Sequence, residues 1–130
     1  MPIPASSSSC SRRAARSSVC FHALVPGCAA ETNDDIAFMR FDRELNRIIA
    51  AAAHNEFASR AMGLLQGLSR RFWYMHYKQA ADLPLCARLH ARQARAIAKG
   101  DAAEAAEATD RLMDYVESFT RATVNASVMR

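Results

Sequence analysis

Apolar residues recur at every third or fourth position along most of this chain, and this spacing constrains its fold more than any other feature. Between residues 56 and 78 the row consists of Ala61, Leu65, Leu68, Phe72 and Met75, widened by Leu64. Between residues 101 and 125 another row consists of Ala105, Ala108, Leu112, Val116, Phe119 and Thr123. Such a row forms one face of an α-helix, and no segment shows the alternation of a strand. The sequence therefore predicts an all-α protein whose apolar rows face the core.

Local signals divide the helical part of the chain into helices. We expect four of them, at about residues 33–53, 56–78, 84–99 and 101–125. Pro84 is tolerated in a first helical turn, and Gly100 is a typical helix stop. Asp101 then caps the last helix, with Glu104 as its capping-box-like partner. Four amphipathic helices joined by short turns predict an antiparallel bundle, and any site must point into it.

Residues 1–31 are a different kind of sequence, rich in Ser, Arg, Ala and Cys. We expect a disordered or poorly packed leader there, followed by a helical domain at 32–125 and a short tail at 126–130. The leader resembles an organellar transit peptide, a weak signal peptide, or residues added by a mis-assigned start of the reading frame.

The basic charge of the chain comes largely from this leader. Three of the 17 Lys and Arg residues lie in residues 1–30, which contain no acidic residue, so the rest carries 14 basic and 13 acidic residues. Both signs are interspersed along the helices, which argues against a nucleic-acid surface. No apolar run reaches the roughly 20 residues of a membrane span, so we expect a soluble domain without a membrane partner.

Three segments of the helical part match the motifs of one family. DRELNRIIAAAAHN is similar to the pattern D-x-x-F-H-x-x-L-x-x-A-A-x-N, and LQGLSRRFWY is similar to the helix that follows it in that family. HARQARAIAKGDAAEAAEA matches the pattern H-x-x-I-x-x-A-I-x-x-G-D-x-x-x-A. From residue 32 to about 125 the chain thus resembles the FadR C-terminal (FCD) effector-binding domain of GntR-type bacterial transcription regulators.

The resemblance implies a function and partners. It implies a truncated FCD-like bundle that binds a small carboxylate effector, forms a homodimer and, in a full-length protein, modulates DNA binding. DNA would be bound only through a winged helix-turn-helix, which is not recognisable in this chain. Because that part is missing, we favour the mis-assigned start for the leader, and we expect a bacterial, cytoplasmic protein rather than an exported one.

The resemblance also implies where the effector site lies. Metal-binding members of the family use an Asp and a His four residues apart, a second His, and a further His on the last helix. Carried over, Asp42 and His90 keep their positions, whereas Asn46 and Leu112 replace the other two histidines. An amide is a weak ligand and Leu is none. Three interpretations stay open: a divalent metal held by Asp42, Asn46 and His90, direct effector binding, or a satisfied polar patch in the core.

Arg71 completes the predicted effector site. It falls on the row of Leu64, Leu68 and Met75 that we expect to border the core, whereas Arg70 points away. A guanidinium facing a polar cavity binds a carboxylate through two parallel hydrogen bonds. The alternative is an arginine that reaches the surface or pairs with Asp42.

We expect no enzymatic activity. A Cys86–His90 pair would need an orienting third group and an oxyanion site, and the sequence suggests neither. Two other functions compete with effector sensing. One is a helical dimerisation or interaction module without a ligand, and the other is a small helical-bundle metalloenzyme. The metalloenzyme is disfavoured because the Glu-x-x-His motif of such bundles is absent from the sequence.

Overall fold

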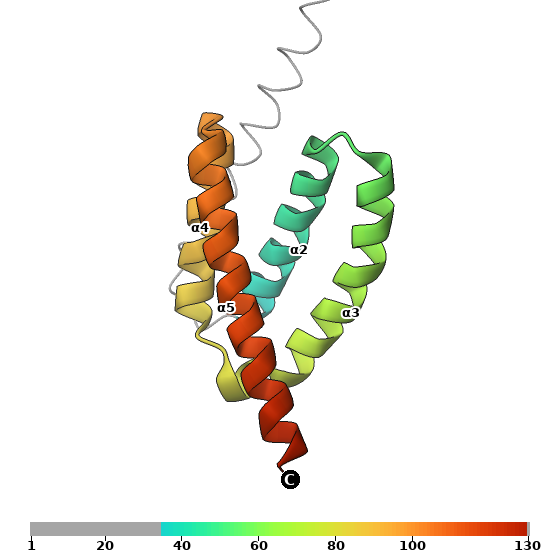
Figure 1. The fold of residues 1–130 in the computed structure, drawn as a ribbon, viewed down its shortest axis with the longest axis vertical. Coiled ribbons are helices and arrows are strands. Elements are labelled where there is room, and N and C mark those ends of the chain that lie inside the picture. Colours follow the sequence, from blue (N-terminus) through green and yellow to red (C-terminus); the bar gives the residue numbers. More distant parts are fainter. Residues whose placement is uncertain (1–34, 130) are drawn as a thin grey trace, which may run out of the picture.

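The computed structural model describes residues 35–129 and, within that range, contains four α-helices and no strand (Figure 1). The helices are α2 (Asp35–Ala52), α3 (Glu56–Ala80), α4 (Leu83–Lys99) and α5 (Ala102–Val128). The predicted all-α fold is confirmed, and α5 continues into the predicted tail. The predicted leader and the predicted start of the first helix lie outside the described residues.

The four helices form a ring in which each helix packs against two others. Helix α2 contacts α3 and α4, and α5 likewise contacts α3 and α4. Consecutive helices run in opposite directions, as Figure 1 shows. The structure is therefore the antiparallel bundle that the sequence predicts. None of the helices described is both long enough and apolar enough to cross a bilayer.

The helix boundaries follow from local hydrogen bonds. Asn55, Asp82 and Asp101 precede α3, α4 and α5, and each side chain accepts a hydrogen bond from the backbone N–H three residues later, at 2.9, 2.8 and 3.0 Å. These bonds satisfy donors that a helix start leaves without a partner. Gly100 ends α4 in the left-handed conformation, with a φ of 73° that glycine adopts without strain. The predicted turns are thus confirmed.

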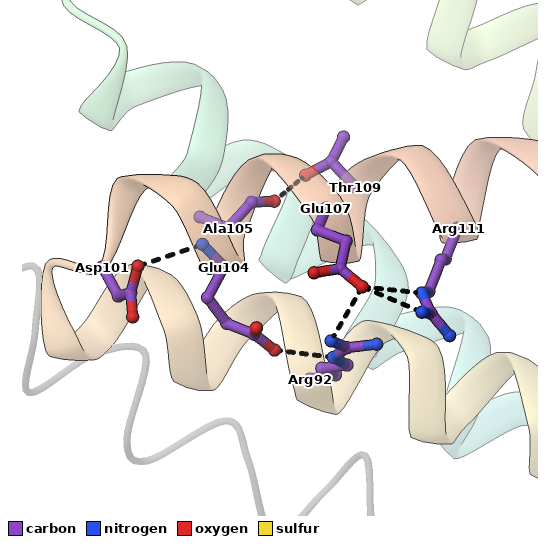
Figure 2. Close-up of polar contacts among 7 residues, drawn as sticks. All are labelled: Arg92, Asp101, Glu104, Ala105, Glu107, Thr109 and Arg111. Atoms are coloured by element: carbon purple, nitrogen blue, oxygen red, sulfur yellow. Dashed lines mark hydrogen bonds and ion pairs between the residues drawn. The ribbon is translucent and has the colours of Figure 1, made fainter.

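Side chains on the outer surface tie α4 to α5 (Figure 2). The Arg92 Nε donates to Glu104 at 2.6 Å, and its Nη2 lies 3.4 Å from Glu107, which also pairs with Arg111. We expected the Glu104 carboxylate to close a capping box with Asp101. It binds Arg92 instead. Between the helices, Gln93 donates to Thr109 at 2.9 Å. Several small side chains of these two helices are also buried, namely Ala87, Ala91, Ala94, Ala96 and Ala108.

The core consists of two apolar clusters. One joins α2 to α4 through Phe41, Leu45, Ala91 and Ala94. The other draws on all four helices and contains Met39, Trp73, Tyr77, Cys86, Leu112 and Phe119. The predicted core face of α5 is confirmed, because Ala108, Leu112, Phe119 and Thr123 are buried.

The predicted core face of α3 is wrong except at Phe72, which is partly buried and packs against the core. Leu64, Leu65, Leu68 and Met75 are 57 to 78% exposed, and Ala61 is exposed as well. Trp73 and Tyr77 are instead the buried residues of α3. The spacing correctly groups residues on one face, but α3 carries apolar residues on more than one face. The bundle packs against the face with the two aromatic rings, which offers the larger apolar area.

Candidate functional site

Asp42, Asn46 and His90 come together where α2 meets α4. Asp42 and Asn46 lie one turn apart on α2, and the Asn46 amide donates to Asp42 Oδ1 at 3.1 Å. His90 reaches the same oxygen from α4, with its Nε2 also at 3.1 Å. The His90 side chain is 8% exposed and the Asp42 side chain 24%. The structure thus brings together three of the residues that the sequence singles out.

The surroundings of His90 favour its charged form. Its Nδ1 lies 2.9 Å from the carbonyl oxygen of Cys86, which can only accept, so Nδ1 carries a proton. Burial, the largest influence, lowers the pKa of His90, but hydrogen bonds to Asp42 and Cys86 and the charges there outweigh it and raise the pKa to about 10. An imidazolium with acceptors at both nitrogens therefore forms a mostly buried ion pair with Asp42.

Two aromatic rings hold the imidazole in place. Phe38 and Phe41 of α2 lie edge-on to the His90 ring, with centroids 5.9 and 6.5 Å away and interplanar angles near perpendicular. Such edge contacts stabilise aromatic pairs and restrict ring rotation. Because Nδ1 is also bound to the backbone, Nε2 is the nitrogen that faces Asp42 and the centre of the bundle.

This polar cluster lines a cavity to which all four helices contribute side chains and which is partly open to solvent. The cavity has a volume of about 230 Å³. Helix α2 contributes Asp42 and Asn46, and α4 contributes His90 and Cys86. The remaining walls are formed by Phe38, Met39, Met62, Leu65, Gln66, Ser69, Arg70, Trp73, Leu112, Met113 and Val116. A mostly apolar cavity with a few convergent polar groups is the usual form of a small-molecule site.

Arg70, and not Arg71, is the arginine of this cavity. Arg71 is exposed and does not line the cavity, which agrees with the alternative of an arginine that reaches the surface and not with one that faces the cavity. The reason is the rotation of α3 described above: Arg71 shares the row of Leu64, Leu68 and Met75, and that row faces solvent. Arg70 lies on the other side of the helix and is partly buried. Its Nε–H is buried with no hydrogen-bond partner among the described residues.

The residues of the cavity fit a transition-metal ion poorly. Within residues 35–129 no group of three or more His, Cys, Asp and Glu side chains is placed to hold a metal. Asp42 and His90 offer two strong ligands, but Asn46 directs its N–H group, a donor, toward Asp42. Leu112, at the position of the family's last histidine, is 4% exposed and presents only carbon atoms. This set has fewer strong ligands than zinc sites use.

Gln66, Ser69, Arg70 and Trp73 line the cavity, although none of them belongs to the apolar row predicted to face the core. A signal for them was present in the chain. These residues recur at intervals of three and four and lead to Tyr77, so they share a face with the two largest buried rings of α3. Weighting aromatic residues above aliphatic ones would have selected this face, because aromatic rings bury more area per side chain.

The fold and the site together define a class of protein: a four-helix bundle with a cavity that all four described helices line. Comparison with known families makes this specific. The FCD domain family matches residues 23–115, and the chain belongs to this family, the C-terminal effector-binding domain of GntR-family regulators. The match begins within the segment that we assigned to the leader. No curated protein and no solved structure matches the chain.

Proposed function

We propose that this domain senses a small carboxylate metabolite bound in the cavity of the four helices. In a full-length regulator, occupancy of the cavity would change the placement of attached DNA-binding domains and so their affinity for DNA. Membership in the FCD family supports the sensing role in general. The choice of a carboxylate comes from the cavity itself.

The observation that carries this choice is the unpartnered Nε–H of Arg70. A buried donor without an acceptor costs free energy, so such a group in a native protein calls for an explanation. A carboxylate that enters the cavity supplies the missing acceptor and binds the guanidinium through a charge-assisted hydrogen bond. No ion pair with a described residue competes for Arg70, because Asp42 already accepts from His90 and Asn46.

A bound carboxylate would also link the helices. Arg70 lies on α3, whereas His90 and Asn46 lie on α4 and α2. Helix α3 buries Trp73 and Tyr77 among its described side chains, so fewer buried side chains fix its position than fix that of α4. A ligand between Arg70 and the polar cluster therefore stabilises one position of α3. Binding is in this way coupled to a conformational change.

Thermal unfolding of the full chain with a panel of small carboxylates tests the proposal. A ligand at 100 times its Kd raises the free energy of unfolding by about 2.7 kcal/mol, which a melting curve resolves. Arg70→Gln should abolish the shift. Arg71→Gln is the matched control, since it removes the same charge from the neighbouring exposed position and should keep the shift.

Either of two results contradicts the proposal: no carboxylate shifts the transition, or both arginine variants respond like the wild type. The same titrations after EDTA treatment test whether Asp42, Asn46 and His90 hold a divalent metal that assists binding. A shift that needs both metal and carboxylate would support this metal-assisted form, and a shift unaffected by EDTA would support direct binding.

A second function, self-association, is favoured by the exposed apolar row of α3. Phe57, Leu64, Leu68 and Met75 are 66 to 86% exposed and recur at intervals of 7, 4 and 7 residues, which places them on one face of the helix. They are placed symmetrically about Gln66, so an antiparallel pair of α3 helices would set Phe57 against Met75 and Leu64 against Leu68. Sedimentation of wild type and Leu68→Glu tests this. Dimers that the substitution dissociates support it, and monomers at all concentrations contradict it.

A further inference from the structure

The walls of the cavity restrict the chemistry of its ligand further, an inference that rests on the function proposed above. The polar side chains come from α2, α3 and α4. The wall formed by α5 consists of Leu112, Met113 and Val116 and offers no hydrogen-bonding side chain. Trp73 and Leu65 of α3 extend this apolar surface. One side of a ligand therefore meets polar groups and the other meets carbon atoms only.

The charges of the cavity limit the charge of the ligand. Asp42 contributes one negative charge, and Arg70 contributes one positive charge. Whether the His90 imidazole is neutral or protonated, at most one positive charge is left after Asp42 is neutralised. One carboxylate of a ligand can therefore be paired, and a second would be buried without a partner, which is strongly unfavourable.

Hydroxyl groups on the ligand are also disfavoured near α5. A ligand hydroxyl that leaves water needs a new hydrogen-bond partner, and the α5 wall supplies none. The cavity volume of about 230 Å³ also favours a small ligand over a large one. A short hydrocarbon body fits both limits.

We infer that the cavity selects a small monocarboxylate with an apolar body over dicarboxylates and polyhydroxylated acids of similar size. The carboxylate binds Arg70 near the polar cluster, and the hydrocarbon part lies against α5. Val116 and Met113 then act as specificity-determining residues, because they exclude polar substituents at the far end of the ligand.

Calorimetric titration of the full chain with hexanoate, glutarate, threonate and 1-hexanol tests the inference. Hexanoate should bind about tenfold more tightly than either glutarate or threonate, whose extra polar groups have no partner. It should also bind about tenfold more tightly than 1-hexanol, which lacks the charge for Arg70. Tighter binding of glutarate or threonate overturns the inference and leaves the proposed function intact. Binding of none of the carboxylates overturns both.

A pair of variants tests the role of α5. Val116→Thr places a hydroxyl in the apolar wall at nearly constant side-chain volume. It should lower the ratio of the affinity for hexanoate to the affinity for threonate by about threefold. Val124→Thr makes the same change on the exposed part of α5 and should leave the preference unchanged. An unchanged preference in the Val116 variant overturns the placement of the hydrocarbon part against α5.

Discussion

Helices α4 and α5 are held to each other along their length, whereas α3 contacts the bundle through one narrow face. Helix α4 buries seven side chains, four of which are alanines. The described part of α3, a longer helix, buries Trp73 and Tyr77 and exposes an apolar row. His90 therefore comes from a largely buried helix, whereas Arg70 comes from a helix with most of its described surface exposed.

The largest difference in the loss of stability should appear between alanine substitutions of two phenylalanines. Phe119 of α5 is 4% exposed and stacks on Trp73 with centroids 4.4 Å apart, whereas Phe57 of α3 is 86% exposed. Phe119→Ala should lower the free energy of unfolding by about 3 to 4 kcal/mol. Phe57→Ala should change it by less than about 0.5 kcal/mol. Urea denaturation measures both, and equal losses would show that the outer face of α3 is covered in solution.

The second difference concerns pH and the His90–Asp42 pair. The folded state raises the pKa of His90 from 6.5 to about 10, so the folded state holds the proton more tightly than the unfolded state. The stabilisation is therefore complete below about pH 6.5 and is lost as the pH rises toward 10. We expect a loss on the order of 2 kcal/mol, because solvent screens the partly exposed Asp42.

Urea denaturation at pH 6 and pH 9.5 measures this loss. Asp42→Asn removes the charge that favours the imidazolium, and in this variant the decrease over the same interval should be much smaller. Asp110→Asn, at an exposed position of α5, is the matched control and should behave like the wild type. An identical decrease in the Asp42 variant would show that other groups cause it.

Replacing a glycine by alanine should change the free energy of unfolding in opposite directions in the two regions. Gly100 closes α4 at a φ of 73°, so Gly100→Ala should destabilise the protein by about 1 kcal/mol. Gly67 lies within α3, and a Cβ there would meet nothing within 4 Å. Gly67→Ala should therefore stabilise by about 0.5 to 1 kcal/mol, because alanine favours a helix. Melting temperatures report both signs, and destabilisation by Gly67→Ala would indicate close contact with another surface.

The smallest effect should come from the surface charges of α4 and α5. Arg92 joins Glu104 and Glu107 in a network between the two helices, whereas Arg121 pairs with Glu117 within α5. Arg92→Gln should cost more stability than Arg121→Gln, because Arg92 reaches two carboxylates of the neighbouring helix, and both losses should be small. Both losses should shrink in 1 M salt, and a loss for Arg92→Gln that salt does not change would point to packing instead of charge.

Parts of the site could be predicted and others could not. Asp42 and Asn46 were found because residues four apart share a helix face, and His90 because the family motif names it. Arg70 was missed, although it adjoins the predicted Arg71. Adjacent residues on a helix point about 100° apart, so a rotation of α3 by this amount exchanges the two arginines. The spacing of the aliphatic residues of α3 does not indicate which rotation the bundle selects, whereas the positions of Trp73 and Tyr77 favour the observed one.

The sequence by itself determined the helices, their ends and the faces on which residues gather. These features depend on interactions between residues at most a few positions apart, such as the bond from Asp101 to the N–H of Glu104. Only the tertiary structure decided which face of α3 is buried and which arginine lines the cavity. That choice depends on contacts with α2 and α5, because a helix with apolar residues on more than one face gains its stability from the face that finds a partner.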